Sequence, residues 1–153
     1  MAKKKKELDE LEKKIIKALQ ADARKSFKSI AKDLDVSEST ISNRVGRLIE
    51  NGILKMEARI NPFELDNKVT ALIGLNLKHR FHPKVLKELQ QLPNVNSVWV
   101  TTGKYDLFME VIADSNNDLN DFLFKSEFNR MEEITFTETH IMLYSETKYF
   151  KIP

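Results

Sequence analysis

The spacing of apolar residues changes once along the 153-residue chain, and this change constrains the fold more than any other feature. Between residues 7 and 52, apolar side chains recur at steps of three and four, the spacing of one helix face. From residue 69 onward, "VTALIGLNLK" carries an apolar residue at every second position, which is typical of a β-strand. The sequence therefore predicts an all-helical first part and a mixed second part, together an α+β protein.

Three helices account for the first part. Leucine and isoleucine spacing predicts a helix over about residues 7–20. Ser26 is suited to cap the start of a second helix and Ser37 the start of a third, which the Asn-Gly pair at 51–52 ends. Asp35 lies in the tight turn between these two helices, where the backbone must enter the left-handed region that Asp tolerates.

The second part reads as strand, helix, strand, strand, helix and strand, which is the ferredoxin-like β-α-β-β-α-β order. Residues 54–60, just before it, look extended and predict a short wing strand after the third helix. We expect a helical domain at 1–52, a wing strand and linker at 53–68, and the sheet domain at 69–153. The expected elements of that domain are a strand at 69–78, a helix after Pro83, a hairpin over 95–113 around Gly103-Lys104, a helix from Ser115 and a strand at 134–144.

Composition limits the kinds of protein this chain can be. Its 41% hydrophobic and 31% charged residues suit a folded protein rather than a disordered one. The absence of cysteine excludes disulfides, thiolate metal sites and a cysteine nucleophile, and it fits the reducing cytoplasm, where we expect the protein to be. Neither a secretory signal nor a membrane-spanning segment is expected, because the apolar runs are short.

Positive charge is concentrated in the first part. Residues 1–60 hold 15 Lys and Arg against 10 Asp and Glu, whereas residues 61–153 hold 10 against 13. A basic module joined to a mildly acidic one indicates a partner that is a polyanion. The Lys3–Lys6 run within it is either a solvated tail or an arm that binds phosphates.

The third helix indicates which polyanion. At 100° per residue, Ile41, Val45 and Leu48 share one face and predict the core side. The outward side carries Ser, Thr, Asn and Arg, where a plain solvated face would favour Glu, Lys, Gln and Ala. Two helices joined by a tight turn, with such a face on the second, are typical of a helix-turn-helix that reads the major groove of DNA.

The chemistry of these side chains suits double-stranded DNA, because Asn pairs with adenine, Arg with guanine, and hydroxyls with bases or phosphates. A protein-interaction surface and an ordinary solvated face remain alternatives. The predicted contacts to bases or the groove floor are Ser39, Thr40, Asn43 and Arg47, and those to phosphates are Ser37, Arg44 and Lys55.

A resemblance to a known family then becomes specific. The stretch "LDELEKKIIKALQADARKSFKSIAKDLDVSESTISNRVGRLIENGIL" resembles the winged helix-turn-helix of the Lrp/AsnC (feast/famine) transcription regulators. "TTGKYDLFMEV" is similar to the Gly-x-Tyr-Asp loop and following strand of their RAM domain, and the match runs from about Leu8 to Thr147. Two departures are Glu12, where the family usually has Asp, and the loosely matching wing "KMEARINPFEL".

The resemblance implies a winged helix-turn-helix joined to a RAM domain, in a homodimer that stacks further, often to an octamer, through the RAM domains. A two-fold dimer would bind a pseudo-palindromic operator. The sequence agrees, because apolar residues occupy both faces of the strands: Leu72 opposes Ile73, and Phe108 opposes Leu107. An antiparallel sheet that is apolar on both faces needs a cover on each, and a second copy is one such cover.

The resemblance also implies a small-molecule site between RAM domains, with an amino acid as the usual effector. Gly103 would let backbone amides approach a carboxylate, and Asp106 would hold an ammonium group. Alternatively, Gly103 only makes a turn, Tyr105 packs at an interface and the threonines are ordinary strand residues. The predicted effector-binding residues are Thr102, Gly103, Tyr105, Asp106, Thr137 and Thr139.

Catalysis is not expected, and neither are cofactors or metals. His79 and His82 lie three residues apart with no carboxylate close in sequence, and His140 is a strand residue. The four glycines form no phosphate-binding loop, and no serine lies in a nucleophile elbow. Two alternatives to a specific regulator are a low-specificity architectural DNA-binding protein and an enzyme like the sirohaem decarboxylases that resemble this family.

Overall fold

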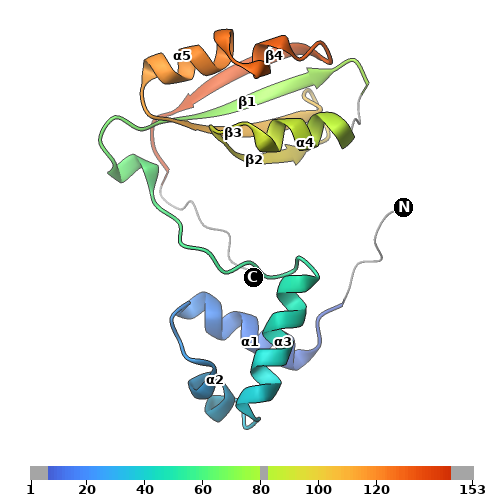
Figure 1. Cartoon of the computed structure of the whole chain (residues 1–153), viewed down its shortest axis with the longest axis vertical. Helices are drawn as coiled ribbons and strands as arrows, with labels where there is room; N and C mark the ends of the chain where they lie inside the picture. The colour runs from blue at the N-terminus through green and yellow to red at the C-terminus, as the bar shows by residue number, and fades with distance from the viewer. Residues whose placement is uncertain (1–6, 80–82, 146–153) are drawn as a thin grey trace. The chain divides into compact units, whose positions relative to one another are not determined.

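The computed structural model of the chain describes residues 7–79 and 83–145. The chain divides between residues 59 and 60 into two compact units, which we call the helical unit and the sheet unit (Figure 1). This division falls inside the segment 53–68 that the sequence predicts as wing and linker.

The helical unit holds three helices, α1 (Glu10–Ala21), α2 (Phe27–Asp33) and α3 (Glu38–Glu50). Their apolar faces meet in one core, in which Ile15, Ile30 and Ile41 are fully buried. The predicted core residues of the third helix, Ile41, Val45 and Leu48, are all buried, which confirms the helical spacing. Helix α1 begins three residues later than the sequence predicts.

That later start has a local cause at Asp9. The Asp9 side chain accepts a hydrogen bond from the Glu12 N–H (2.8 Å), and the Glu12 side chain accepts one from the Asp9 N–H (3.2 Å). This reciprocal capping box satisfies two of the amide groups that a helix start leaves without partners. Glu12 is therefore both a helix-start residue and a buried carboxylate, with 1% of its surface exposed.

The predicted starts of α2 and α3 are confirmed. The Ser26 and Ser37 hydroxyls accept the N–H groups of Ser29 and Thr40 respectively, as helix caps do. Asp35 has a φ of 54°, so the turn before α3 does use the left-handed region.

The predicted wing strand is not formed. Residues 54–60 form neither a strand nor a helix. A strand needs a neighbour with which to exchange backbone hydrogen bonds, and these residues have no ladder partner among the described residues. Instead, Glu57 forms ion pairs with Lys55 and Arg59, two residues before and two residues after it.

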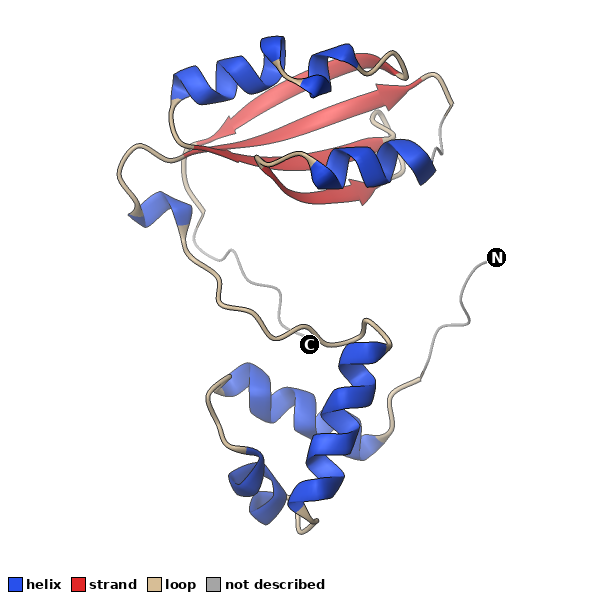
Figure 2. Ribbon diagram, viewed as in Figure 1, coloured by secondary structure: helices blue, strands red, loops and turns tan. Residues whose placement is uncertain are grey.

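The sheet unit has the predicted β-α-β-β-α-β order (Figure 2). Its four strands form one antiparallel sheet in the order β2-β3-β1-β4, so β3 separates β1 from β2. The strands are β1 (Val69–Leu77), β2 (Val95–Val100), β3 (Leu107–Ala113) and β4 (Ile134–Met142). The helices are α4 (Pro83–Gln91) and α5 (Asn116–Lys125), with short 3-10 turns η1 (Pro62–Glu64) and η2 (Glu127–Arg130).

The two faces of the sheet have different surroundings. On one face, alternate residues of β1 and β3, such as Ile73 and Met109, are fully buried in a core with residues of α4 and α5. We call the other face the open face; the strand register places Leu72, Gly74, Phe108, Glu138 and His140 on it. The apolar residues predicted for the second face, Leu72 and Phe108, thus lie on the open face beside the polar Glu138 and His140.

Candidate DNA-binding and ligand-binding sites

The polar face of α3 is exposed as predicted. Ser37, Ser39, Asn43 and Arg47 are all exposed, and Thr40 is half-buried. At the start of the helix, the Ser37 hydroxyl lies 2.9 Å from that of Ser39 and 2.8 Å from that of Thr40. The helix cap thus gathers three hydroxyls at one point, where a hydroxyl can donate to a phosphate, or donate to or accept from a base.

The Arg44 side chain is bound by two carboxylates at the start of α1. Its guanidinium forms an ion pair with Asp9 and lies 3.5 Å from the carboxylate of Glu12, which joins α3 to the start of α1. The hydrogen bond from Arg44 to Asp9 is the main cause that raises the pKa of Arg44. The pKa of Asp9 is lowered, chiefly because its carboxylate accepts the Glu12 N–H and also because it faces Arg44. Sequence reasoning assigned Arg44 to phosphates, but its observed partners are two carboxylates.

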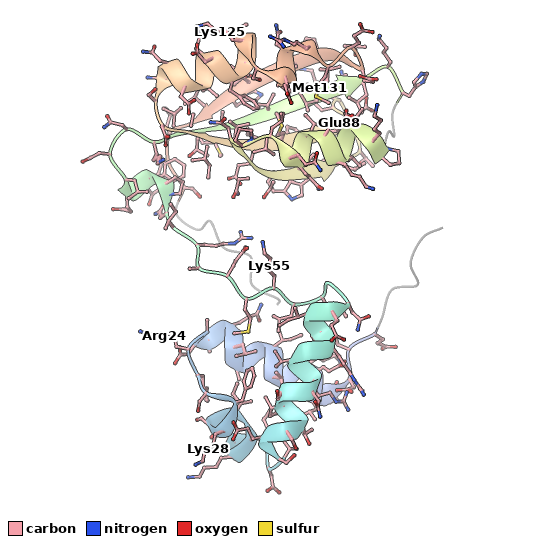
Figure 3. The ribbon with its side chains drawn as sticks, in the orientation of Figure 1. Arg24, Lys28, Lys55, Glu88, Lys125 and Met131 are labelled. Atoms are coloured by element: carbon pink, nitrogen blue, oxygen red, sulfur yellow. The ribbon has the colours of Figure 1, made fainter. Side chains whose placement is uncertain are left out.

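Lys55 lies just beyond α3 and points away from the three helices (Figure 3). It is exposed, as a phosphate contact requires, but it pairs with Glu57. The hydrogen bond from Lys55 is the largest cause that lowers the pKa of Glu57, followed by the one from Arg59. A phosphate would have to compete with Glu57 for this lysine.

The loop between β2 and β3 is longer than the two-residue turn that "GK" suggested; it spans residues 101–106, which we call the hairpin loop. Gly103 has a φ of 114°, a conformation that side-chain-bearing residues rarely adopt. The Thr101 hydroxyl donates to the Tyr105 carbonyl (2.9 Å), and the Thr101 N–H donates to the Asp106 carbonyl (2.9 Å). These bonds give the loop a defined shape, with Thr102 and Gly103 exposed at its tip.

Asp106 fastens the hairpin loop to β1. Its backbone N–H donates to the Leu75 carbonyl (2.9 Å), and its side chain accepts the Leu77 N–H (3.0 Å). The sequence predicted that Asp106 would hold the ammonium group of an effector, whereas here its carboxylate already serves the backbone of β1. The observed role of this half-buried carboxylate is therefore to hold the hairpin loop on β1.

Tyr105 folds from the loop onto the open face, where only 8% of its surface is exposed. Its ring lies edge-on to Phe108, with centroids 5.3 Å apart, and stacks near Phe136 at 6.3 Å. Its hydroxyl donates to Glu138. The Lys104 ammonium lies 4.8 Å from the centroid of the Tyr105 ring and 2.8 Å from the Glu138 carboxylate.

These contacts shift the titration of both charged groups. The pKa of Lys104 is raised, first because its ammonium bonds to Glu138 and then because of Tyr105. The pKa of Glu138 is lowered, first by the hydrogen bond from Lys104 and then by that from Tyr105. His140 also faces this carboxylate, with Nε2 3.1 Å from Glu138.

The six predicted effector residues do not lie together within a single copy. Thr137 and Thr139 pair with Leu75 and Ile73, so they lie on the helix-covered face, opposite Tyr105. Side chains alternate between the faces of a strand, and Glu138, between the two threonines, is the residue that meets the hairpin loop. Thr137 and Thr139 instead line a groove of about 260 Å³ between β4 and the α5–η2 segment.

Sequence reasoning missed Lys104, Glu138 and Gly74. Lys104 is the variable position of Gly-x-Tyr-Asp, and Glu138 lies between the two threonines, so each was adjacent to a predicted residue. Gly74 carried a weaker signal, since an isolated glycine within a strand often marks a close approach. The capping role of Glu12 is also missed, although an acidic residue three positions after Asp9 is a capping-box pattern.

No group of three or more metal-ligating side chains lies together in the part of the chain that the structure describes. His79 lies within that part, whereas His82 lies outside it. Within residues 7–79 and 83–145, no helix has both the length and the apolar character needed to cross a bilayer.

Each of the two units matches a known family model. Residues 8–55 match the winged helix-turn-helix DNA-binding model, and residues 70–151 match the Lrp/AsnC ligand binding domain. The second match alone covers more than half of the chain. The chain belongs to the Lrp/AsnC family.

Alignments with relatives cover nearly the whole length of this Lrp/AsnC protein. It is 38% identical to an uncharacterized HTH-type transcriptional regulator of Pyrococcus furiosus over 136 residues, 88% of this chain and 91% of the relative. It is 31% identical to AsnC of E. coli, whose structure superposes with a TM-score of 0.77 over 97% of this chain and all of that one. A transcriptional regulator of Neisseria meningitidis solved as an L-Met complex shares the fold, with a TM-score of 0.73, 19% identity and coverage of 96% and 97%.

The Lrp/AsnC protein is thus a DNA-binding transcriptional regulator that carries a ligand-binding domain, and its DNA-binding part is the helix-turn-helix. Relatives are named as transcriptional regulators rather than enzymes, in agreement with the prediction that the chain is not an enzyme.

Proposed function

We propose that this regulator binds a specific pseudo-palindromic operator as a dimer or larger assembly, and that an amino acid bound between its ligand-binding domains modulates it. The observation that carries the proposal is the face of α3: an exposed set of Ser, Asn and Arg side chains on a helix whose opposite side is fully buried. A helix with these features enters the major groove in helix-turn-helix proteins.

Two side chains on α3 would read the sequence. Asn43 is exposed in mid-helix, where its amide would pair with adenine, and Arg47 lies one turn further along, where its fork would pair with guanine. The hydroxyls of Ser37, Ser39 and Thr40 would contact phosphates or bases near the helix start. Arg44 would act on DNA mainly by holding α3 against α1, because its guanidinium is bound to Asp9 and Glu12.

A second copy is the proposed cover of the open face. Trp99 and Phe136 are 38% and 47% exposed there, beside the half-buried Leu72 and Phe108. Large aromatic residues that gather on one exposed face are typical of an interface. A two-fold pair would present two α3 helices to two half-sites, and such a pair is needed because one small helical unit buries little DNA surface. Further stacking toward an octamer is part of the proposal.

The split of the predicted effector residues supports a site between copies. Thr102, Gly103 and Tyr105 lie in the hairpin loop, whereas Thr137 and Thr139 lie on the other face of the sheet. A small ligand that contacts both groups must therefore take them from different copies. The L-Met complex of the Neisseria relative supports an amino acid as the ligand class. A protein with this role works where the DNA is, which supports the expected cytoplasmic location.

The DNA part is tested by selecting fragments from a random pool and measuring affinity by fluorescence anisotropy at several salt concentrations. We expect selected fragments to bind at least about 1,000-fold more tightly than scrambled ones at physiological salt. Arg47→Ala should weaken DNA binding. Lys84→Ala, which also removes one positive charge but from an exposed side chain of α4, should not. Equal affinity for selected and scrambled DNA would instead support the architectural alternative.

The effector part is tested separately by thermal unfolding of the full chain with each amino acid. A ligand that binds only the folded protein raises Tm, and the stabilisation grows with the logarithm of its concentration once that exceeds Kd. We expect one amino acid, or one chemical group of them, to raise Tm and to change operator affinity. Unchanged Tm with every amino acid would remove the effector from the proposal and leave DNA binding in place.

A further inference from the structure

The open face contains one place where the hairpin loop and the sheet fit closely. Strand β1 carries Gly74 directly beneath the Tyr105 ring, in register with Phe108 on β3 and Glu138 on β4. A Cβ built on Gly74 would lie 2.8 Å from Cγ and Cδ2 of Tyr105 and 2.9 Å from Cδ1. Non-bonded carbon atoms approach only to about 3.5 Å at their optimal separation, so any other residue here would displace the ring.

The ring has little freedom to move aside. The three atoms in conflict are those nearest the backbone of Tyr105, so a rotation of the ring tip would not relieve them. Phe108 and Phe136 flank the ring, the hydroxyl is bound to Glu138, and Lys104 lies over it. A side chain at position 74 would therefore lift Tyr105, and the hairpin loop with it, away from the sheet.

We propose that Gly74 is a positioning residue for the hairpin loop: by leaving space for the Tyr105 ring, it makes the loop a part of the open face. The proposal rests on the proposed function, in which a second copy covers this face and the loop contributes to the effector site. Loop conformation and self-association are then linked through one ring, because a loop that lifts also alters the surface that the second copy contacts.

The test is a set of full-chain variants: Gly74→Ala, Tyr105→Ala, Tyr105→Phe and the double variant Gly74→Ala/Tyr105→Ala. Self-association is followed by sedimentation and by the emission of Trp99, the one tryptophan of the chain, which is 38% exposed on the open face. Folding is followed by denaturant unfolding. Gly46→Ala is the matched control, because a Cβ there meets nothing within 4 Å.

Gly74→Ala should raise the dissociation constant of self-association and lower the folding equilibrium constant, each by at least about tenfold, as overpacking does. Gly46→Ala should cause neither loss. In the Tyr105→Ala background the Gly74→Ala change should cost almost nothing, because the ring that it strikes is gone. In the Tyr105→Phe background the full cost should remain, because the ring is retained.

Two results would overturn the proposal. One is a Gly74→Ala variant that self-associates as tightly as the wild type. The other is a double variant whose loss equals the product of the losses in Gly74→Ala and Tyr105→Ala, because the two residues would then act independently. If Gly74→Ala fails to fold, the double variant is expected to fold, and its failure would count equally against the proposal. A wild-type protein that stays monomeric at all concentrations would instead refute the self-association part of the proposed function. The unfolding measurements would then still decide whether Gly74 and Tyr105 are coupled.

Discussion

In the helical unit, the residues proposed to contact DNA lie together on the outward side of one helix, whereas in the sheet unit the residues proposed to contact an effector are divided between two faces of a sheet. Helix α3 presents these polar side chains on one side, and the Ser37 hydroxyl lies within hydrogen-bond distance of the Ser39 and Thr40 hydroxyls. The sheet unit leaves Trp99 and Phe136 exposed beside its hairpin loop. In this proposal, the DNA-binding residues lie together in a single chain, whereas the effector site takes residues from two copies.

The largest effect is expected from Leu48→Ala, a fully buried position of α3. The loss of packing should destabilise the helical unit by about 2–5 kcal/mol and abolish operator binding, since α3 no longer holds its position. The self-association of the sheet unit should persist, which would sharpen the distinction between the units. Ile49→Ala, at the exposed next position of the same helix, should change stability by about 0.5 kcal/mol or less. Denaturant unfolding measures stability, anisotropy measures operator affinity, and sedimentation measures self-association. Loss of self-association in Leu48→Ala would contradict the distinction between the two units.

The second prediction separates reading DNA from holding the helix that reads it. Asn43→Ala should reduce discrimination at one base pair of each half-site by about 1–3 kcal/mol while the protein stays equally stable. Arg44→Ala should weaken binding to all sequences alike and lower Tm, because it removes the link from α3 to Asp9 and Glu12. Affinities on a panel of single-base operator variants distinguish the two. A base-specific loss in Arg44→Ala with unchanged Tm would show that Arg44 contacts DNA directly.

Matched helix caps provide a smaller test. Ser37 caps α3 and Ser115 caps α5 in the same way, each accepting an N–H three residues ahead at 3.1 Å. Replacing either by Ala should cost about 1 kcal/mol of stability, because the same hydrogen bond is lost. Only Ser37→Ala should also weaken operator binding. Equal effects of both variants on operator binding would mean that Ser37 acts through stability alone.

The smallest effect is expected from lowering the pH, which should slightly reduce the stability of the sheet unit. The pKa of Glu138 is lowered by Lys104 and Tyr105, so its contribution to stability is present above the ordinary value of 4.5 and is lost as pH falls through the lowered pKa. Wild-type protein should therefore lose slightly more stability between pH 7 and pH 3 than Glu138→Gln, and the loss should be small because Glu138 is 36% exposed. Unfolding free energies of both proteins at several pH values measure the difference, and parallel pH profiles would show that the Glu138 contacts do not stabilise the sheet unit.

The sequence predicted those features that depend on residues a few positions apart. The caps at Ser26 and Ser37 and the left-handed Asp35 are local, and all three are present. The spacing of apolar residues predicted the buried face of α3 and the β-α-β-β-α-β order, because both follow from the direction of side chains along single elements.

Features that depend on distant residues were not predictable in this way. Arg44 and its partner Glu12 are 32 positions apart, and nothing in the local pattern of either residue indicates the other. The register that pairs Gly74 of β1 with Glu138 of β4 is not apparent from the sequence. Since a strand alternates its faces, this register decides that Glu138 rather than Thr137 or Thr139 meets the hairpin loop.

The most direct test of sequence-specific operator binding by a dimer is a footprint of the full-length protein. The DNA would be the region upstream of its own gene at physiological salt, with and without a mixture of amino acids and against scrambled competitor. We expect protected patches about 10 base pairs apart that outcompete scrambled DNA, as two α3 helices one helical turn apart would give. Diffuse protection that scrambled DNA removes equally, or no protection at any salt, would contradict it.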